Sequence, residues 1–137
     1  MKLEECINYL LTGAQHRVFN EMKKELKEYD LTPIQYGVLK CIWQNNMSNP
    51  KEIAEFLGVE NSTISGILER MEGKGLLERN IDGQDRRFIQ ISLTDQSKAL
   101  EKNVNKSVEH VNKVMLDGFS KEETLQFKNY LRRIKAV

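Results

Sequence analysis

The segment between residues 49 and 93 constrains the fold of this chain more than any other feature, because the spacing of its apolar residues changes along it. The segment starts with Asn49-Pro50, which is typical of a helix beginning. The asparagine can cap the first turn, and the N–H that proline lacks would have no partner within the helix at this position. Gly58 ends this short helix. A second helix follows, and after Leu76 the spacing of apolar residues changes from helical to alternating. Helix, turn, helix and hairpin in this order predict a winged helix-turn-helix.

The second helix of this segment begins at Asn61 or Ser62 and ends at Gly75. Apolar residues form one side of it: Ile64, Ile67, Leu68 and Met71. Small and polar residues form the other side: Ser62, Thr63, Ser65, Gly66, Glu69, Arg70 and Gly73. Because small side chains let another molecule come close, this helix has the character of a recognition helix.

The hairpin that follows has its second strand near Ile89, Ile91 and Leu93, which point to one side and alternate with polar residues. Asp82-Gly83 is a strong turn signal, and Arg86-Arg87 lie close to the predicted tip. The predicted hairpin therefore carries two adjacent arginines near its tip.

Bulk charge does not indicate a nucleic-acid partner. The chain has 137 residues, with 21 lysines and arginines against 20 acidic residues, so its formal net charge is only +1. A hydrophobic content of 39% is enough for one unit with its own core. Any affinity for DNA must therefore come from where the charges lie on the surface.

Several other classes of function lack support in the sequence. No apolar run approaches membrane-spanning length, and Glu4-Glu5 stand where a signal peptide needs apolar residues, so we expect a cytoplasmic protein without membrane contact. Cys6 and Cys41 have neither metal-ligand nor disulfide spacing, and we expect both to be reduced and buried. His16 and His110 lie on different predicted helices without catalytic partners, so no enzyme, metal site or cofactor is expected.

Long amphipathic helices precede and follow the winged segment. Residues 2–28 form one predicted helix, and a capping box at Thr32-Pro33-Ile34-Gln35 starts the next, after which Met47 is a candidate for a short third strand. A further helix runs from Thr94 to Gly118, and a second capping box at Ser120–Glu123 opens the last. The expected fold is mainly α with a small β-hairpin.

The terminal helices have more apolar surface than the winged segment can cover, so we expect them to pack against the same helices of a second copy. Residues 1–137 then form a single unit. Residues 32–93 make the winged helix-turn-helix part, and residues 1–31 and 94–137 make a helical dimerisation module.

Several motifs in register resemble the multiple-antibiotic-resistance regulator (MarR) family: Leu31–Tyr36, Ser62–Ser65, Leu68–Leu76, and Asp85-Arg86-Arg87 leading to Leu93-Thr94. The wing is the most specific of these motifs. The resemblance covers nearly the whole chain. It implies homodimeric winged-helix transcription regulators whose terminal helices form the dimer and whose small-molecule effectors weaken DNA binding.

The resemblance also implies roles for individual residues. Arg87 matches the arginine that enters the minor groove from the wing, steadied by Asp85, although an arginine in a turn is more often only solvated. Arg70 matches an arginine that contacts the DNA backbone. The hydroxyl residues of the recognition helix either meet phosphates and base edges or cap the helix. Gly66 departs from the family pattern, in which many members carry an arginine. The expected DNA-binding residues are Asn61, Ser62, Thr63, Ser65, Gly66, Arg70, Asp85, Arg86 and Arg87.

The function that this resemblance implies is a dimeric repressor that binds a palindromic operator on double-stranded DNA and is released by a small anionic or aromatic effector. We expect the effector where the terminal helices meet the winged part, with Gly13 and Ala14 leaving room. Arg17 could hold an anionic group and Tyr36 could supply a ring and a hydroxyl. An ion-paired arginine and a core tyrosine are the alternative interpretations of these two residues.

Two other functions stay open. A winged domain can serve protein contact instead of DNA binding. One branch of the resembling family senses organic peroxides with a cysteine in its first helix, which invites comparison with Cys6. Alignment through Leu10-Leu11 places that position at Asn8, about 200° away around a helix, and neighbouring Glu4 and Glu5 give a thiolate no cationic support. We therefore expect no redox switching.

Overall fold

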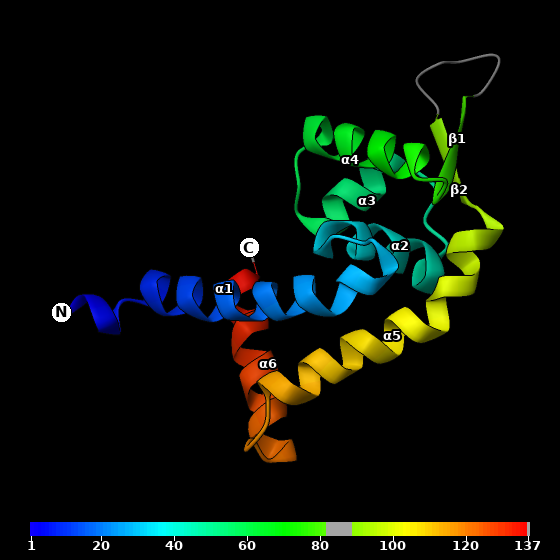
Figure 1. The fold of residues 1–137 in the computed structure, drawn as a ribbon. Coiled ribbons are helices and arrows are strands. Elements are labelled where there is room, and N and C mark those ends of the chain that lie inside the picture. Colours follow the sequence, from blue (N-terminus) through cyan, green and yellow to red (C-terminus); the bar gives the residue numbers. More distant parts are fainter. Residues whose placement is uncertain (82–88, 137) are drawn as a thin grey trace.

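The computed structural model describes residues 1–81 and 89–136, in which helices dominate and two strands form one hairpin (Figure 1). The elements follow in the order η1 (Leu3–Glu5), α1 (Ile7–Leu26), η2 (Lys27–Tyr29), α2 (Pro33–Asn45), α3 (Pro50–Leu57), α4 (Asn61–Gly73), β1 (Leu77–Ile81), β2 (Ile89–Leu93), α5 (Asp95–Met115) and α6 (Lys121–Lys135). The predicted order of helix, turn, helix and hairpin is confirmed.

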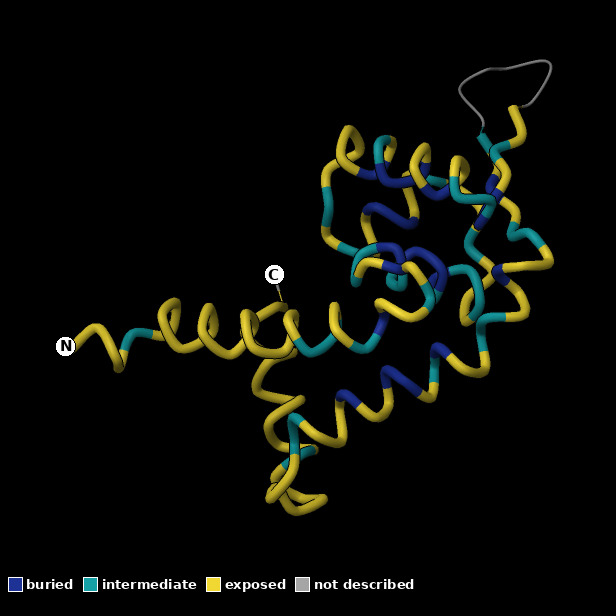
Figure 2. Tube along the Cα trace, viewed as in Figure 1, coloured by how far each residue is buried: buried dark blue, intermediate teal, exposed yellow. Residues whose placement is uncertain are grey.

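One hydrophobic core holds the winged part together. Its fully buried side chains come from α2, α3, α4 and β1, and they include Leu39, Ile53, Leu68 and Leu77. Leu26 from the end of α1 joins the same core, as does Val104 from α5. The burial pattern shows the consequence: dark blue lies in this body and recurs along most of α5, whereas the N-terminal half of α1 and nearly all of α6 are exposed (Figure 2).

The predicted helix beginnings are confirmed where local chemistry determines them. Thr32 and Ser120 each accept a hydrogen bond from the third backbone amide of their helix, and each is part of a complete capping box. Thr94 caps α5 through its third amide without a box, and Asn49 caps α3 by accepting from the second backbone amide, that of Lys51. Gly58, at φ +70°, ends α3 in the left-handed conformation that glycine adopts without steric cost.

The hairpin has the predicted alternation. Leu77 pairs with Leu93 and Ile81 with Ile89 in an antiparallel register. Ile91 is buried, whereas Gln90 and Ser92 are exposed. The third strand expected from Met47 is wrong: a single bond, from Ile91 N to Ser48 O at 2.8 Å, joins that segment to β2, and Met47 N instead bonds back to Cys41 O.

The single N-terminal helix predicted over residues 2–28 is also wrong. The backbone N–H of Cys6 returns to Leu3 O, which closes a 3₁₀ turn, and Cys6 itself is extended at φ −71° and ψ 128°. The α-helix therefore begins only at Ile7 and gives way to η2 at Lys27. Cys6 is also only partly buried, against expectation, while Cys41 is buried as expected.

Two arms extend from the winged body as long helices: the first arm is η1, α1 and η2, and the last arm is α5 and α6 (Figure 1). α1 packs against α5 near the body, and its N-terminal half projects beyond it. α6 turns back from the end of α5 after Gly118, which has φ +88°. Among the described residues, no helix has the length and apolarity needed to cross a membrane.

Candidate nucleic-acid interface

The N-terminal end of α4 differs from the other helix beginnings of the winged part. Its N-cap residue is Glu60, and no side chain there accepts a hydrogen bond from the first turn. In contrast, α2 and α3 are capped by Thr32 and Asn49. The first N–H groups of a helix need partners from outside it and carry the positive end of the helix dipole, so an anion such as a phosphate can meet them here.

The two sides of α4 are those that the sequence predicted. Its apolar residues are buried in the core: Ile64, Ile67, Leu68 and Met71. Its polar residues face solvent: Asn61, Ser62, Thr63, Ser65, Glu69 and Arg70. None of the three hydroxyl residues caps the helix, so the capping interpretation of Ser62, Thr63 and Ser65 is wrong. Their hydroxyl groups lie on the open surface beside the uncapped amides.

Gly66 lies in the middle of this exposed side. A Cβ atom built at Gly66 meets nothing within 4 Å in the part of the chain that the structure describes, and the same holds for Gly73 at the end of the helix. Packing inside the chain therefore gives no reason for a glycine at position 66. A glycine there costs helix stability, yet it lets the backbone of another molecule approach α4.

The basic residues of this region differ in whether their charge has a partner within the chain. Arg79 on β1 donates to the Glu72 carboxylate at 2.9 Å, and these hydrogen bonds hold the pKa of Glu72 below its ordinary value. Lys74 bonds to Asp30 and Gln35. Arg70 is exposed and makes no ion pair with any residue in the described ranges, so its charge faces solvent.

The predicted residues of the wing, Asp85, Arg86 and Arg87, lie outside the described residues. The structure describes the hairpin from the pair Leu77 and Leu93 up to the pair Ile81 and Ile89, the last described pair before the tip of the wing. The roles assigned to the three wing residues stay predictions.

The two predicted effector residues lie on different helices. Arg17 is exposed on α1, and Tyr36 is half-buried on α2, where burial raises the pKa of its hydroxyl and Glu109 on α5 raises it further. A recess at the α5–α6 turn is lined by other residues, including His110 and Phe119. This recess includes neither Arg17 nor Tyr36.

The residues considered for other chemistry are also separate. His16 on α1 and His110 on α5 are both exposed. Over residues 1–81 and 89–136 no group of three or more histidine, cysteine or acidic side chains is placed to hold a metal ion. Burial raises the pKa of the Cys41 thiol, which disfavours a reactive thiolate at that position.

Comparisons with known proteins agree with this geometry. The MarR family model matches residues 31–89. The organic hydroperoxide resistance transcriptional regulator of Bacillus subtilis (strain 168) is 31% identical over 101 residues, which is 74% of this chain and 69% of that protein. The transcriptional regulator MgrA of Staphylococcus aureus is 28% identical over 96% of this chain and 89% of its own length.

Solved structures agree with the fold as well. The transcriptional repressor CouR bound to a 23-mer DNA duplex is 28% identical, has a TM-score of 0.85, and is covered over 94% of its chain by 97% of this one. Its fold is therefore similar from the first arm to the last. The winged helix-turn-helix, the exposed α4 and the extent of these matches show that the chain belongs to the MarR family of transcriptional regulators.

Proposed function

We propose that this protein is a DNA-binding transcription repressor that acts as a homodimer on a palindromic operator and is released by a small-molecule effector. The observation that carries the proposal is the open side of α4, where hydroxyl groups and uncapped amides lie together on an exposed helix. This side suits the major groove, with Asn61, Ser62, Thr63, Ser65 and Gly66 near the bases and Arg70 at a phosphate. In this proposal residues 32–93 bind DNA.

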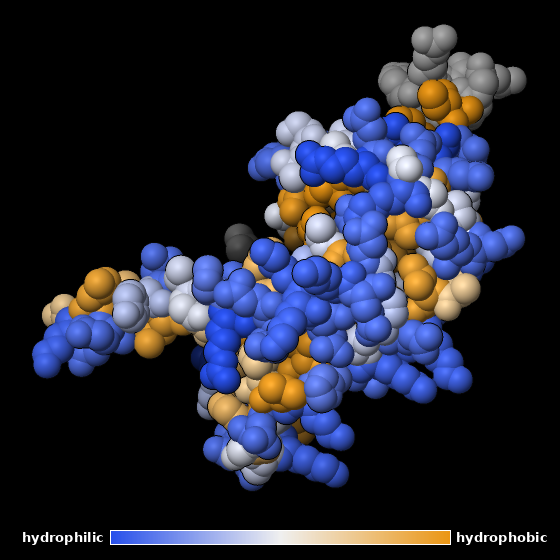
Figure 3. Space-filling view, viewed as in Figure 1, coloured by the Kyte–Doolittle hydropathy of each residue, from blue (hydrophilic) through white to orange (hydrophobic). Residues whose placement is uncertain are grey.

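The exposed apolar surface of the arms supports the homodimer. In the single chain, large apolar side chains of α1 and α6 stay in solvent, including Leu10, Phe19, Leu125 and Ile134. Orange patches are visible at the N-terminal end and around the α5–α6 turn (Figure 3). Contiguous apolar surface of this kind marks an interaction site. Residues 1–31 and 94–137 are therefore assigned to dimerisation, so that each dimer presents two copies of α4.

The proposal is tested by DNA binding at several salt concentrations. We expect tight binding to a duplex from the region upstream of the protein's own gene, with affinity that falls steeply as salt rises, because phosphate contacts release counterions. An unrelated duplex of the same length is the control. Salt-independent or absent binding to both duplexes would favour the alternative, a winged domain that contacts proteins.

Arg17 and Tyr36 remain the proposed effector residues, one on each side of the junction between arm and body. A ligand held there could tilt the two copies of α4 and change their spacing. Titration of the protein with aromatic acids, monitored by the fluorescence of the single Trp43, tests this assignment. Equal affinity of the parent and of Arg17→Ala would remove Arg17 from the site.

The match to an organic hydroperoxide resistance regulator favours a second candidate, a cysteine-based redox sensor. Of the two cysteines, both of which the structure describes, Cys6 is partly exposed and Cys41 is buried, so Cys6 is the candidate thiol. Cys6 is extended and lies outside α1, so the prediction that it points away from Asn8 around a helix is wrong. Among the residues described there, the recess beside Cys6 contains no lysine or arginine, and His16 is its one basic residue. A peroxide-sensing thiolate needs cationic or hydrogen-bonding support, which in this recess only His16 could supply as a cation. Exposure of the operator complex to organic peroxide tests this candidate.

A further inference from the structure

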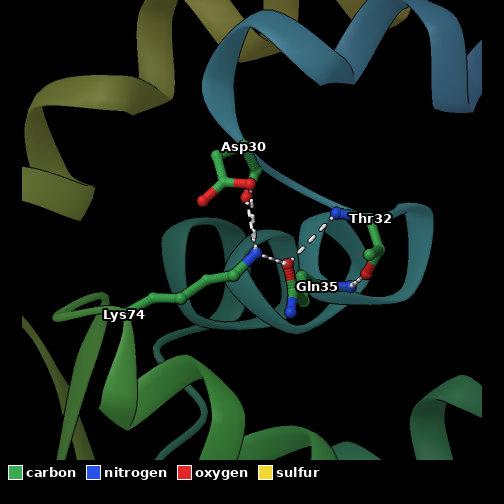
Figure 4. A network of polar contacts seen from close by, with 4 residues as sticks. All are labelled: Asp30, Thr32, Gln35 and Lys74. Atoms are coloured by element: carbon green, nitrogen blue, oxygen red, sulfur yellow. Dashed lines mark hydrogen bonds and ion pairs between the residues drawn. The ribbon is translucent and has the colours of Figure 1, made fainter.

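A network of polar contacts ties the end of the recognition helix to the end of the first arm (Figure 4). Lys74 follows α4 directly, and its ammonium group donates to the backbone oxygen of Asp30 at 2.7 Å and to Gln35 Oε1 at 3.1 Å. The Asp30 carboxylate lies 3.6 Å from the same nitrogen. Asp30 closes η2 after α1, and Gln35 lies in the first turn of α2. One side chain thus joins three elements.

Contacts that do not involve Lys74 hold its two partners, Asp30 and Gln35, in place. Asp30 has the left-handed conformation at φ 55°, and its N–H returns to Lys27 O, so its carbonyl oxygen comes after the last helical turn. Gln35 is buried, and its Oε1 also accepts from the Thr32 N–H at 3.1 Å as part of the capping box. The receiving oxygen atoms therefore have defined positions, set by the α1–α2 connection.

The contact adds a directional polar constraint to the hydrophobic packing that holds α4 against the core. Leu26 of α1 and Met71 of α4 share the same core, but apolar contacts are non-directional. An ammonium group with several fixed acceptors has a preferred geometry, and hydrogen bonds to charged groups are stronger than neutral ones. The Lys74 side chain is about one-third exposed and Gln35 is buried, which limits replacement of their hydrogen bond by water. The Asp30 side chain is 90% exposed, so its ion pair with Lys74 contributes little.

We propose that Lys74 is a positioning residue that fixes the angle of α4 relative to α1, and thereby the half-site spacing that a dimer accepts on DNA. The second part rests on the proposed function. α1 belongs to the arm through which two copies pair, and α4 carries the reading surface. The Lys74 contact, called the strut below, links the arm to α4, so the way in which two arms pair determines the distance between the two recognition helices.

A distance measurement tests the angle without any DNA. Spin labels are attached through Gln15→Cys on α1 and Glu69→Cys on α4, both exposed, in a Cys6→Ser background and diluted with unlabelled protein so that only distances within one chain are read. We expect Lys74→Met to broaden the distance distribution and Lys74→Arg to restore most of its sharpness. Arg70→Met, which removes a cation from the same helix but not from the strut, is the matched control and stays sharp.

The Lys74→Met variant is expected to fold, because Gln35 Oε1 keeps its bond from the Thr32 N–H and Asp30 is exposed to water. Thermal unfolding confirms this before the labels are read. A distribution in Lys74→Met as sharp as that of the parent would overturn the proposal, whatever the protein does with DNA.

The spacing prediction is tested on duplexes in which base pairs are inserted between the half-sites. The parent should lose about tenfold or more in affinity on the altered spacing, and Lys74→Met should lose much less, since the strut is worth about one charged hydrogen bond. Arg70→Met should weaken binding equally at every spacing. If the parent binds no duplex, the proposed function fails, and the spin-label distances still decide the role of Lys74. An unchanged spacing preference in Lys74→Met would refute its role on DNA.

Discussion

Gly66 shows most directly how one residue on α4 can favour a partner over the stability of the free protein. A mid-helix glycine costs roughly 0.5–1 kcal/mol relative to alanine, and a Cβ at this position meets no atom of residues 1–81 or 89–136 within 4 Å. We expect Gly66→Ala to raise the free energy of unfolding by about that amount and to weaken operator binding. Urea unfolding and fluorescence anisotropy measure the two effects.

Gly73→Ala is the matched control for Gly66, since it fills equally open space at the far end of the same helix. It should stabilise the protein without loss of operator affinity. Full affinity in Gly66→Ala would show that DNA does not approach α4 at this point.

Arg87 is predicted from the wing motif to contact the minor groove. Replacement by alanine should weaken operator binding and reduce the salt slope by about one, because one phosphate-region cation is lost. Circular dichroism and dimerisation should not change. Asp85→Ala should have a milder effect, since it removes an orienting partner. Unchanged affinity in Arg87→Ala would mean that this arginine is solvated.

The two cysteines should not switch DNA binding. Burial raises the pKa of Cys41, and the recess beside Cys6 is lined by His16 but by no lysine or arginine among its described residues. We expect Cys6→Ser and Cys41→Ser to bind and release operator DNA like the parent, with or without modest organic peroxide. Gel shifts before and after peroxide measure this. Release that disappears in Cys6→Ser would instead establish the redox sensor.

Residues whose role depends on helix periodicity were predictable from the sequence, and those whose role depends on distant partners were not. The exposed and buried sides of α4 follow from spacing alone. The partners of Lys74 lie 44 and 39 positions away in the chain, so no local pattern indicates them. The absence of a side-chain cap on α4 was likewise hidden, because Ser62 and Thr63 are residue types that commonly cap.

At the scale of elements, the Glu72–Arg79 pair joins the last turn of α4 to β1. The guanidinium hydrogen bonds, together with the Arg79 backbone N–H at 3.2 Å, hold the pKa of Glu72 below its ordinary value. A lowered folded-state pKa means that the contact stabilises the fold above the ordinary pKa and that this contribution is lost as pH falls through the folded value. The contact therefore weakens only in acid.

Arg79→Met should move the pKa of Glu72 part of the way back to its ordinary value, since the backbone N–H of residue 79 still donates to the carboxylate. Side-chain carboxyl NMR signals followed over a pH titration measure the shift. Glu123, whose pKa is lowered by the backbone and side chain of Ser120, is the control and should titrate as in the parent. A Glu72 pKa that does not move would show that the guanidinium bonds do not form in solution.

Element boundaries were predicted well where a cap defines them and poorly where it does not. Thr32, Asn49 and Ser120 mark helix beginnings by side-chain hydrogen bonds within three residues. The break at Cys6 has no such signal, because apolar residues keep helical spacing on both sides of it while the backbone turns through a 3₁₀ bond. The strand expected at Met47 fails for a similar reason, since one hydrogen bond to β2 does not make a ladder.

At the scale of the whole molecule, the arms have a surface that a single chain leaves uncovered. The apolar side chains of α6 were visible in the sequence as a helical stripe, and in the structure they face solvent. A stripe on a sequence does not say whether the same chain or another covers it. The structure of one chain separates these cases, because α6 has no buried residue in it.

Ile134 gives the sharpest test of the dimer. It is 59% exposed in the single chain, so an aspartate there has little effect on the fold of one chain, but it would place a charge in the apolar contact of a dimer. We expect Ile134→Asp to sediment as a monomer with an unchanged helical spectrum. Asn129→Asp, which adds the same charge on the same exposed helix, should stay dimeric.

The dimer in turn determines the form of the operator. One reading head per chain and a two-fold axis between chains require two inverted half-sites, with centres about one helical turn, or roughly 10 base pairs, apart. Footprinting of the parent should show both half-sites protected together. Ile134→Asp should protect neither at the same protein concentration, because a monomer keeps only one set of phosphate contacts and loses much of the affinity with the other. Protection of a lone half-site by this monomer at the affinity of the parent would contradict the dimer and leave α4 as an independent DNA-binding unit.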